Sequence, residues 1–71
     1  FNSNTTYLFK NSFHLNLNNN FLRSIASIQP QNFTQLKELY LSSNFIDKIF
    51  KNSFNCLTNL ERLDLGGNNI K

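Results

Sequence analysis

The sequence predicts an α/β solenoid rich in β-structure, in which successive coils of the chain each add one short strand to a parallel sheet. The main observation is a phrase of apolar residues and one asparagine that recurs without gaps at a period of 24 residues: Leu15-x-Leu17-x-x-Asn20-x-Leu22, Leu39-x-Leu41-x-x-Asn44-x-Ile46 and Leu63-x-Leu65-x-x-Asn68-x-Ile70. A fixed period of roughly 20 to 29 residues with this pattern is typical of solenoids whose strands line a horseshoe. The period therefore predicts the architecture of most of the chain.

The same period divides the chain into units, which we count from the leucine that opens the pattern, Leu36 in the middle of the chain. The residues before the first unit then resemble the tail of a preceding element, and the last unit breaks off early. We therefore interpret the chain as one solenoid segment, incomplete at both ends, made of a tail (residues 1–11), two units (12–35 and 36–59) and a partial unit (60–71).

Each Leu-x-Leu tripeptide predicts one strand. Side chains alternate between the two faces of a strand, so the two leucines of a tripeptide point one way and the residues beside them point the other way. We expect the apolar set to face the core. The predicted inward residues are Leu15, Leu17, Leu39, Leu41, Leu63 and Leu65.

The repeated asparagine predicts a structural role for its side chain. A polar group among apolar residues costs free energy unless it is hydrogen-bonded, and the turn after each strand leaves backbone groups that strand pairing does not use. An asparagine amide can satisfy both, because it donates and accepts. We therefore expect Asn20, Asn44 and Asn68 to form a ladder of amides bonded to turn backbone in their own and neighbouring units.

The segments that return the chain from one strand to the next contain no long apolar stripe at helical period. Turns or short 3₁₀ pieces are therefore expected there. Pro30 stands where the next unit has Phe54, so one unit lacks an aromatic core residue, and Ile28 is the candidate to fill that space.

Composition and charge narrow the classes of function. The formal net charge is +3, but the basic residues are spread from Lys10 to Lys71, which does not indicate nucleic-acid binding. No apolar run is long enough to span a bilayer. Cys56 is the single cysteine and stands between Phe54 and Leu57, so we predict a buried position near the core, with a bridge to a cysteine outside the chain as the alternative. No metal-ligand or nucleophile spacing surrounds it, and we expect no cofactor.

The string from Leu36 to Ile49, followed by Phe54, Leu57 and Leu60, resembles the 24-residue "typical" repeat of extracellular leucine-rich-repeat proteins. Phe54 in particular is similar to the phenylalanine that stacks along the convex side of Toll-like receptors and their relatives. The resemblance covers residues 15–70. It implies a right-handed horseshoe with strands on the concave face and irregular or 3₁₀ returns on the convex face.

The resemblance also implies a function. The chain would be a non-catalytic recognition segment of a Toll-like-receptor-like innate immune receptor, in the ectodomain of a single-pass membrane glycoprotein, outside the cell or in the endosomal lumen. Its partners would be a protein or pathogen-derived ligand on the concave or lateral face and a second receptor copy, with the membrane reached only through parts outside this chain. The alternative is a leucine-rich-repeat scaffold, or a secreted or adhesion protein, that binds proteins without signalling.

Two sequons favour an exported context. Asn4-Thr5-Thr6 and Asn32-Phe33-Thr34 each have a non-proline middle residue, so Asn4 and Asn32 are predicted glycosylation sites. The repeat places Asn32 on the return side, where a glycan would not block the sheet.

The outward residues of the strands are the candidate ligand-binding surface. Tyr40 is the first choice, because tyrosine offers a large contact area with few rotamers and a polar tip. Glu38 lies between His14 and Arg62 in a predicted charge row, which we interpret as a solvated face because exposed ion pairs add little free energy, with a binding site as the alternative. The candidate contact residues are Tyr40, His14, Glu38, Arg62, Asn16 and Asp64.

Two further observations concern aromatic and catalytic chemistry. Phe21 and Phe45 occupy equivalent positions, and we expect them to cover the turn, because stacking between adjacent units would bury both rings; rim contacts are the alternative. An enzyme would need an acid and base pair on the strand surface, and His14 with Glu38 is the single neighbouring candidate. The sequence therefore predicts recognition and not catalysis.

Overall fold

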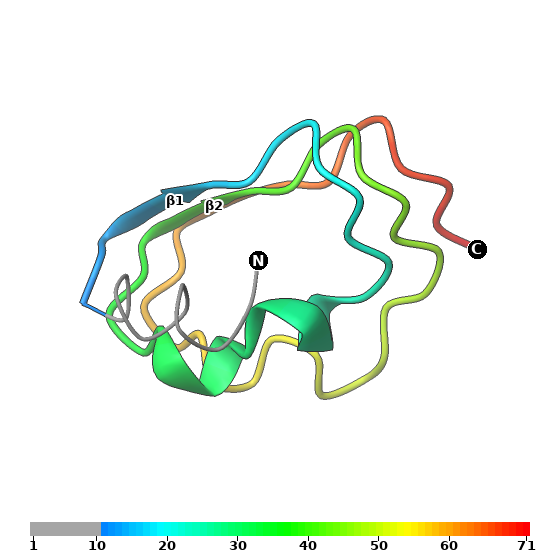
Figure 1. Cartoon of the computed structure of the whole chain (residues 1–71). Helices are drawn as coiled ribbons and strands as arrows, with labels where there is room; N and C mark the ends of the chain where they lie inside the picture. The colour runs from blue at the N-terminus through cyan, green and yellow to red at the C-terminus, as the bar shows by residue number, and fades with distance from the viewer. Residues whose placement is uncertain (1–10) are drawn as a thin grey trace.

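The computed structural model describes residues 11–71 as a stack of three coils. Figure 1 looks nearly along the stack, so the coils superimpose, with the strands gathered on one side and the helical turns on the opposite side. Each coil contributes one three-residue strand: β1 (His14–Asn16), β2 (Glu38–Tyr40) and β3 (Arg62–Asp64). Asn4 and all but the last residue of the predicted tail (residues 1–11) lie outside the described residues.

The three strands form one parallel sheet in the order β1-β2-β3. Leu15 pairs with Leu39, and Leu39 pairs with Leu63, so each pairing joins residues 24 positions apart. The contacts beyond the strands repeat as well: the Leu17 N–H donates to the Tyr40 carbonyl at 2.8 Å, and the equivalent bond in the next pair of coils is also 2.8 Å. The sequence period is therefore the structural period.

The return side contains two short 3₁₀ helices, η1 (Ile25–Ile28) and η2 (Pro30–Asn32). Pro30 begins η2, a position where a missing N–H removes no helical hydrogen bond. In the second coil, residues 51–56 form turns at the same place. The prediction of turns or short 3₁₀ pieces in place of long helices is confirmed.

The core lies between the strands and the return segments. Ile28 and Phe33 are fully buried on the return side of the first coil and belong to the core cluster. Phe54 of the second coil is half-buried and packs against the same cluster. The burial of Ile28 agrees with the expectation that it compensates for Pro30, which stays a prediction. The buried hydrophobic residues are Leu15, Ile25, Ile28, Phe33, Leu36, Leu39, Leu41, Ile46 and Leu57.

Burial of the six strand leucines depends on the coil that carries them. Leu15, Leu39 and Leu41 are buried, and Leu17 and Leu65 are half-buried. Leu63 is 37% exposed, so the prediction that it is a core residue is wrong. The physical reason is its place on β3, an edge strand whose open side carries no further strand in the described structure.

Cys56 is exposed, so the prediction of a buried position near the core is also wrong. It ends the turn of residues 51–56, and the chain enters the core one residue later, at Leu57, which is 5% exposed. Position between two apolar residues therefore did not determine which way this side chain points.

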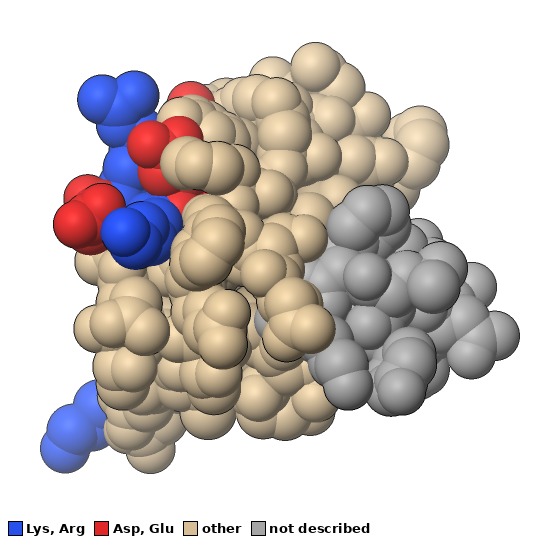
Figure 2. All heavy atoms as spheres, turned by 90° about the vertical axis from the view of Figure 1, so that its left-hand side faces the viewer, with Lys and Arg blue, Asp and Glu red and all other residues tan. Residues whose placement is uncertain are grey.

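Charged side chains of both signs share one part of the surface. In the face seen in Figure 2, red and blue residues lie side by side at the upper left and further blue atoms lie apart at the lower left, while most of the described surface carries neither charge. This face therefore shows no patch of a single sign, which phosphate recognition normally requires.

Within residues 11–71, no helix is long and apolar enough to cross a membrane.

Candidate ligand-binding surface

The chain leaves each strand through a residue of the same backbone conformation. Asn19, Ser43 and Gly67 have φ values of 61°, 58° and 68°, in the left-handed region that disfavours most side chains. At Gly67 an added Cβ would lie 3.0 Å from the Ser43 Oγ and 3.2 Å from the Ser43 nitrogen. Because all three turns are alike, the residues before and after them are held in register from coil to coil.

The Asn44 side chain joins the first two coils. Its amide nitrogen donates to the carbonyls of Leu41 and Leu17, both at 3.0 Å, and its oxygen accepts the Leu22 N–H at 3.1 Å. Asn44 is only 5% exposed. No buried side-chain nitrogen or oxygen among the described residues lacks a hydrogen-bond partner. The amide thus supplies the partners that the turn backbone would otherwise lack.

Asn68 repeats these contacts one coil later. Its amide nitrogen donates to Leu65 and Leu41 at 2.9 Å, and its oxygen accepts the Ile46 N–H at 3.0 Å. Asn20 is exposed, and within residues 11–71 its amide donates to its own turn, to Leu17 at 2.8 Å and Asn18 at 3.2 Å. The Leu17 carbonyl therefore accepts from two successive asparagines.

The six candidate contact residues all lie on the strands, and their outward positions form what we call the strand face. Pairing places Glu38 between His14 and Arg62, and Tyr40 between Asn16 and Asp64. The sheet thus brings residues from three separate units into two adjacent rows: His14, Glu38 and Arg62, and Asn16, Tyr40 and Asp64.

Glu38 is the centre of the strand face. Its Oε1 accepts a hydrogen bond from the Tyr40 hydroxyl at 2.7 Å and lies 3.1 Å from the His14 Nδ1. The Tyr40 hydrogen bond is the main cause that lowers the pKa of Glu38, with smaller lowering contributions from His14 and Arg62 against a desolvation effect that raises it. Tyr40 is half-buried, and this bond fixes the position of its hydroxyl.

Arg62 completes the row on the third strand. Contact with the Tyr40 hydroxyl, and after it the charge of Glu38, raises the pKa of the Arg62 guanidinium above its ordinary value. Arg62 is exposed. The row therefore presents a fixed carboxylate and hydroxyl next to a cation that remains accessible to solvent.

The flanks of Tyr40 use their side chains locally. The Asn16 Oδ1 accepts the Asn18 N–H, and the Asp64 Oδ1 accepts the Gly66 N–H, both at 3.0 Å. These are turns in which an Asn or Asp side chain bonds its own backbone two residues ahead. The Asp-x-Gly spacing of Asp64 and Gly66 is a sequence signal that could have predicted this turn.

A second surface lies on the segments that follow the turns, residues 21–23, 45–47 and 69–71, which we call the post-strand flank. Phe21 and Phe45 stack there with ring centroids 5.9 Å apart and planes inclined by 9°. They remain 83% and 58% exposed, so the expectation that stacking would bury both rings is wrong. The rings cover each other on one side, and their remaining surface is open to solvent.

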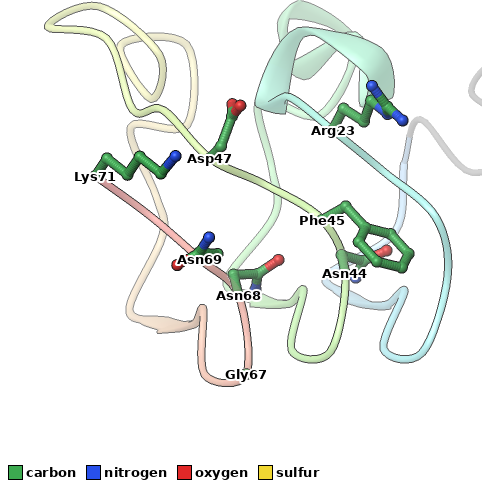
Figure 3. Close-up of a pocket in the computed structure, with 8 residues that line it drawn as sticks. All are labelled: Arg23, Asn44, Phe45, Asp47, Gly67, Asn68, Asn69 and Lys71. Atoms are coloured by element: carbon green, nitrogen blue, oxygen red, sulfur yellow. The ribbon is translucent and has the colours of Figure 1, made fainter.

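A hollow of about 440 Å³ adjoins this stack (Figure 3). Three charged residues in equivalent positions of successive coils contribute to its lining, and sequence reasoning missed this row although the same 24-residue spacing relates its members. The hollow is lined by Arg23, Asn44, Phe45, Asp47, Gly67, Asn68, Asn69 and Lys71.

The structure places Asn32 in η2, on the return side and away from the strands. Its side chain is exposed and donates to the Gln29 Oε1 at 3.3 Å. The strand face is therefore separate from this sequon.

The chemistry available on the strand face is hydrogen bonding and charge. His14 and Glu38 meet, but within residues 11–71 neither has a hydrogen bond to a serine or cysteine that could serve as a nucleophile. The described residues also contain no group of three or more His, Cys, Asp or Glu side chains that could hold a metal ion.

Comparison with known proteins agrees with the repeat geometry. The family model described as "Leucine rich repeat" matches residues 13–70. Toll-like receptor 7 of Mus musculus is 44% identical over 54 residues, which are 76% of this chain and 5% of the length of that receptor. The family and this relative indicate an interaction module and not an enzyme. Since the family match spans the strands, the inter-coil asparagines and the return segments together, the chain belongs to the leucine-rich-repeat family.

Proposed function

We propose that this chain is a ligand- or protein-recognition segment in the ectodomain of a Toll-like-receptor-like innate immune receptor. The observation that carries the proposal is the strand face, where Glu38, Tyr40 and Arg62 from two neighbouring strands form one polar cluster. The 44% identity to Toll-like receptor 7 supports the receptor class. The proposed contact residues are Tyr40, His14, Glu38, Arg62, Asn16 and Asp64.

The cluster suits recognition because it is organised before a partner arrives. The Tyr40 hydroxyl is fixed by a 2.7 Å hydrogen bond, so binding would not need to order that side chain. Tyrosine and arginine are also the residue types that most often dominate binding energy at interfaces. Tyr40 would supply contact area, and Arg62 would meet an acceptor or an anion.

The proposal is tested in the complete protein that contains this chain, expressed in cells that carry a transcriptional reporter of innate immune signalling. Purified microbial proteins, lipids and nucleic acids are the probes. We expect a response to at least one probe, and about a tenfold or larger rise in the half-maximal concentration for Tyr40→Ala combined with Arg62→Ala. Asn55→Ala, an exposed change on the return side, is the matched control.

The scaffold alternative predicts a different result. A scaffold would give no reporter response to any probe, and its sequence beyond Lys71 would lack a hydrophobic span of about 20 residues followed by a cytoplasmic domain. A normal response in the double variant would contradict the strand-face site while leaving the receptor class in place.

The exported location is tested through Asn32, which we propose carries a glycan when the protein is made in a secretory host. Its exposed side chain on η2 is accessible for modification. Peptide mapping before and after glycosidase treatment should show a mass shift at the Asn32 peptide that Asn32→Gln removes. Unmodified Asn32 and Asn4 together would favour a cytosolic scaffold.

A further inference from the structure

Phe21 and Phe45 begin a stack of rings that the third coil does not continue. The equivalent position in that coil is Asn69, whose amide is smaller than a phenyl ring. Phe45 lines the hollow of about 440 Å³ together with Asn69, and Phe21 does not. The hollow therefore lies where a third ring of the stack would stand.

The charged lining of the hollow is unpaired. Arg23, Asp47 and Lys71 come from successive coils, and within residues 11–71 none of the three forms an ion pair with another side chain. Lys71 is tied to the second coil through its N–H, which donates to the Asp47 carbonyl at 2.8 Å. The lining of the hollow thus includes two cationic side chains, Arg23 and Lys71, and one carboxylate side chain, Asp47.

The floor of the hollow is already fixed. The amides of Asn44 and Asn68 are used by backbone groups of neighbouring coils. The Phe45 N–H donates to the Leu22 carbonyl at 2.8 Å. The groups left for a partner are thus the open part of the Phe45 ring, the three charges and the Asn69 amide (Figure 3).

Resting on the proposed function as a recognition segment, we propose that this hollow binds an aromatic side chain of a partner protein that is followed or preceded by an acidic residue. The ring stacks on Phe45 as the third member of the aromatic row, in the offset arrangement that aromatic pairs prefer. The acidic side chain meets Arg23 or Lys71, and Asp47 accepts a backbone N–H of the partner. A volume of about 440 Å³ is larger than one ring needs, so it accommodates the adjoining peptide as well.

The test uses the full chain labelled with ¹⁵N and the synthetic peptide acetyl-Glu-Phe-Glu-amide as the probe. We expect saturable shifts of the backbone amides of residues 44–47 and 67–71. Acetyl-Glu-Ala-Glu-amide and acetyl-Lys-Phe-Lys-amide should each bind about fivefold or more weakly, because each lacks one of the two interactions. Equal shifts from all three peptides would overturn the proposal.

Variants locate the site. Phe45→Leu should weaken binding about fivefold, whereas Phe21→Leu, the matched control at the far end of the stack, should not. Asn69→Phe should abolish binding, since it fills the hollow with a ring from the chain itself. The amide dispersion of the buried Leu39 and Leu41 shows in each variant that the core is intact, and binding retained by a folded Asn69→Phe variant would contradict the site.

Two further results separate this inference from the proposed function. Tyr40→Ala should leave the peptide shifts unchanged, because Tyr40 lies on the strand face and not in the hollow. Shifts confined to the strand face would overturn the inference and support the proposed strand-face site. Phenylacetate that binds as tightly as the peptide would identify a small aromatic acid as the occupant and overturn the claim of a protein partner.

Discussion

The strand face and the post-strand flank have the same 24-residue period but differ in how their side chains are satisfied. On the strand face, Glu38 and Tyr40 bond each other, and Asn16 and Asp64 bond their own turns. On the flank, the phenylalanine rings contact each other yet stay largely exposed, and three charges lack ion pairs within the described residues. A regular period therefore sets which residues are neighbours, while the residue types decide which surface remains open for a partner.

The largest change in stability is expected at Asn44, because its side chain bonds backbone groups next to both the strand face and the post-strand flank. Asn44→Ala removes the acceptor that the Leu22 N–H has within residues 11–71 and leaves this partly buried donor without that partner. The free energy of unfolding should fall by about 1 to 3 kcal/mol. Urea denaturation followed by circular dichroism measures the change, and perturbed amide shifts should appear on the strand face and the flank together.

Asn20→Ala is the control for this prediction. The Leu17 carbonyl that Asn20 bonds also accepts from Asn44, and Asn20 is exposed. The expected loss is below about 0.5 kcal/mol, as for ordinary surface substitutions. Equal losses for the two variants would mean that the contact between coils adds nothing to the stability of the turn.

A smaller effect is expected at Gly67, which joins the strand face to the flank in the third coil. Gly67→Ala places a side chain in the left-handed region at φ 68° and brings its Cβ 3.0 Å from the Ser43 Oγ. We expect a loss of about 1 to 2 kcal/mol in the free energy of unfolding.

Ser43→Gly is the matched change, since Ser43 has φ 58° at the equivalent position of the second coil. It should be neutral or slightly stabilising, because glycine adopts this conformation without the steric penalty. Thermal melts of both variants check the sign. A stabilising Gly67→Ala would show that the third turn relaxes away from the left-handed conformation.

The repeat pattern predicted the positions of the strands and how they pair. The Leu-x-Leu tripeptides predicted all three strands, and the spacing predicted their register. Burial was predicted less well, because it depends on what packs from the neighbouring coil. Leu63 has the same pattern as Leu39 but lies on an edge strand, and Cys56 is turned outward by a turn whose geometry the pattern does not specify.

The candidate site shows the same division. Adjacency of Glu38 to His14 and Arg62 followed from the period. The hydrogen bond from Tyr40 to Glu38 did not, since both residues are on one strand and the bond depends on side-chain orientation. The period could also have predicted the row of Arg23, Asp47 and Lys71, whereas the hollow beside it depends on how side chains from successive coils pack, which the period does not specify.

The smallest effect, and the one that sharpens the comparison most, concerns the pH dependence of the strand face. The pKa of Glu38 is lowered chiefly by the Tyr40 hydroxyl and then by His14. A carboxylate with a folded-state pKa below its unfolded value adds stability above the ordinary pKa, and that stability is lost as the pH falls through the lowered value.

Tyr40→Phe removes the donor and should return the Glu38 pKa towards its ordinary value, as followed by ¹³C NMR of the carboxyl carbon. His14→Gln should also raise the Glu38 pKa, since His14 lowers it through a hydrogen bond and through its charge. Glu38→Gln should remove this part of the acid dependence of unfolding altogether. An unchanged Glu38 titration in Tyr40→Phe would mean that the two side chains do not bond each other in solution, and the strand face would then be as open as the post-strand flank.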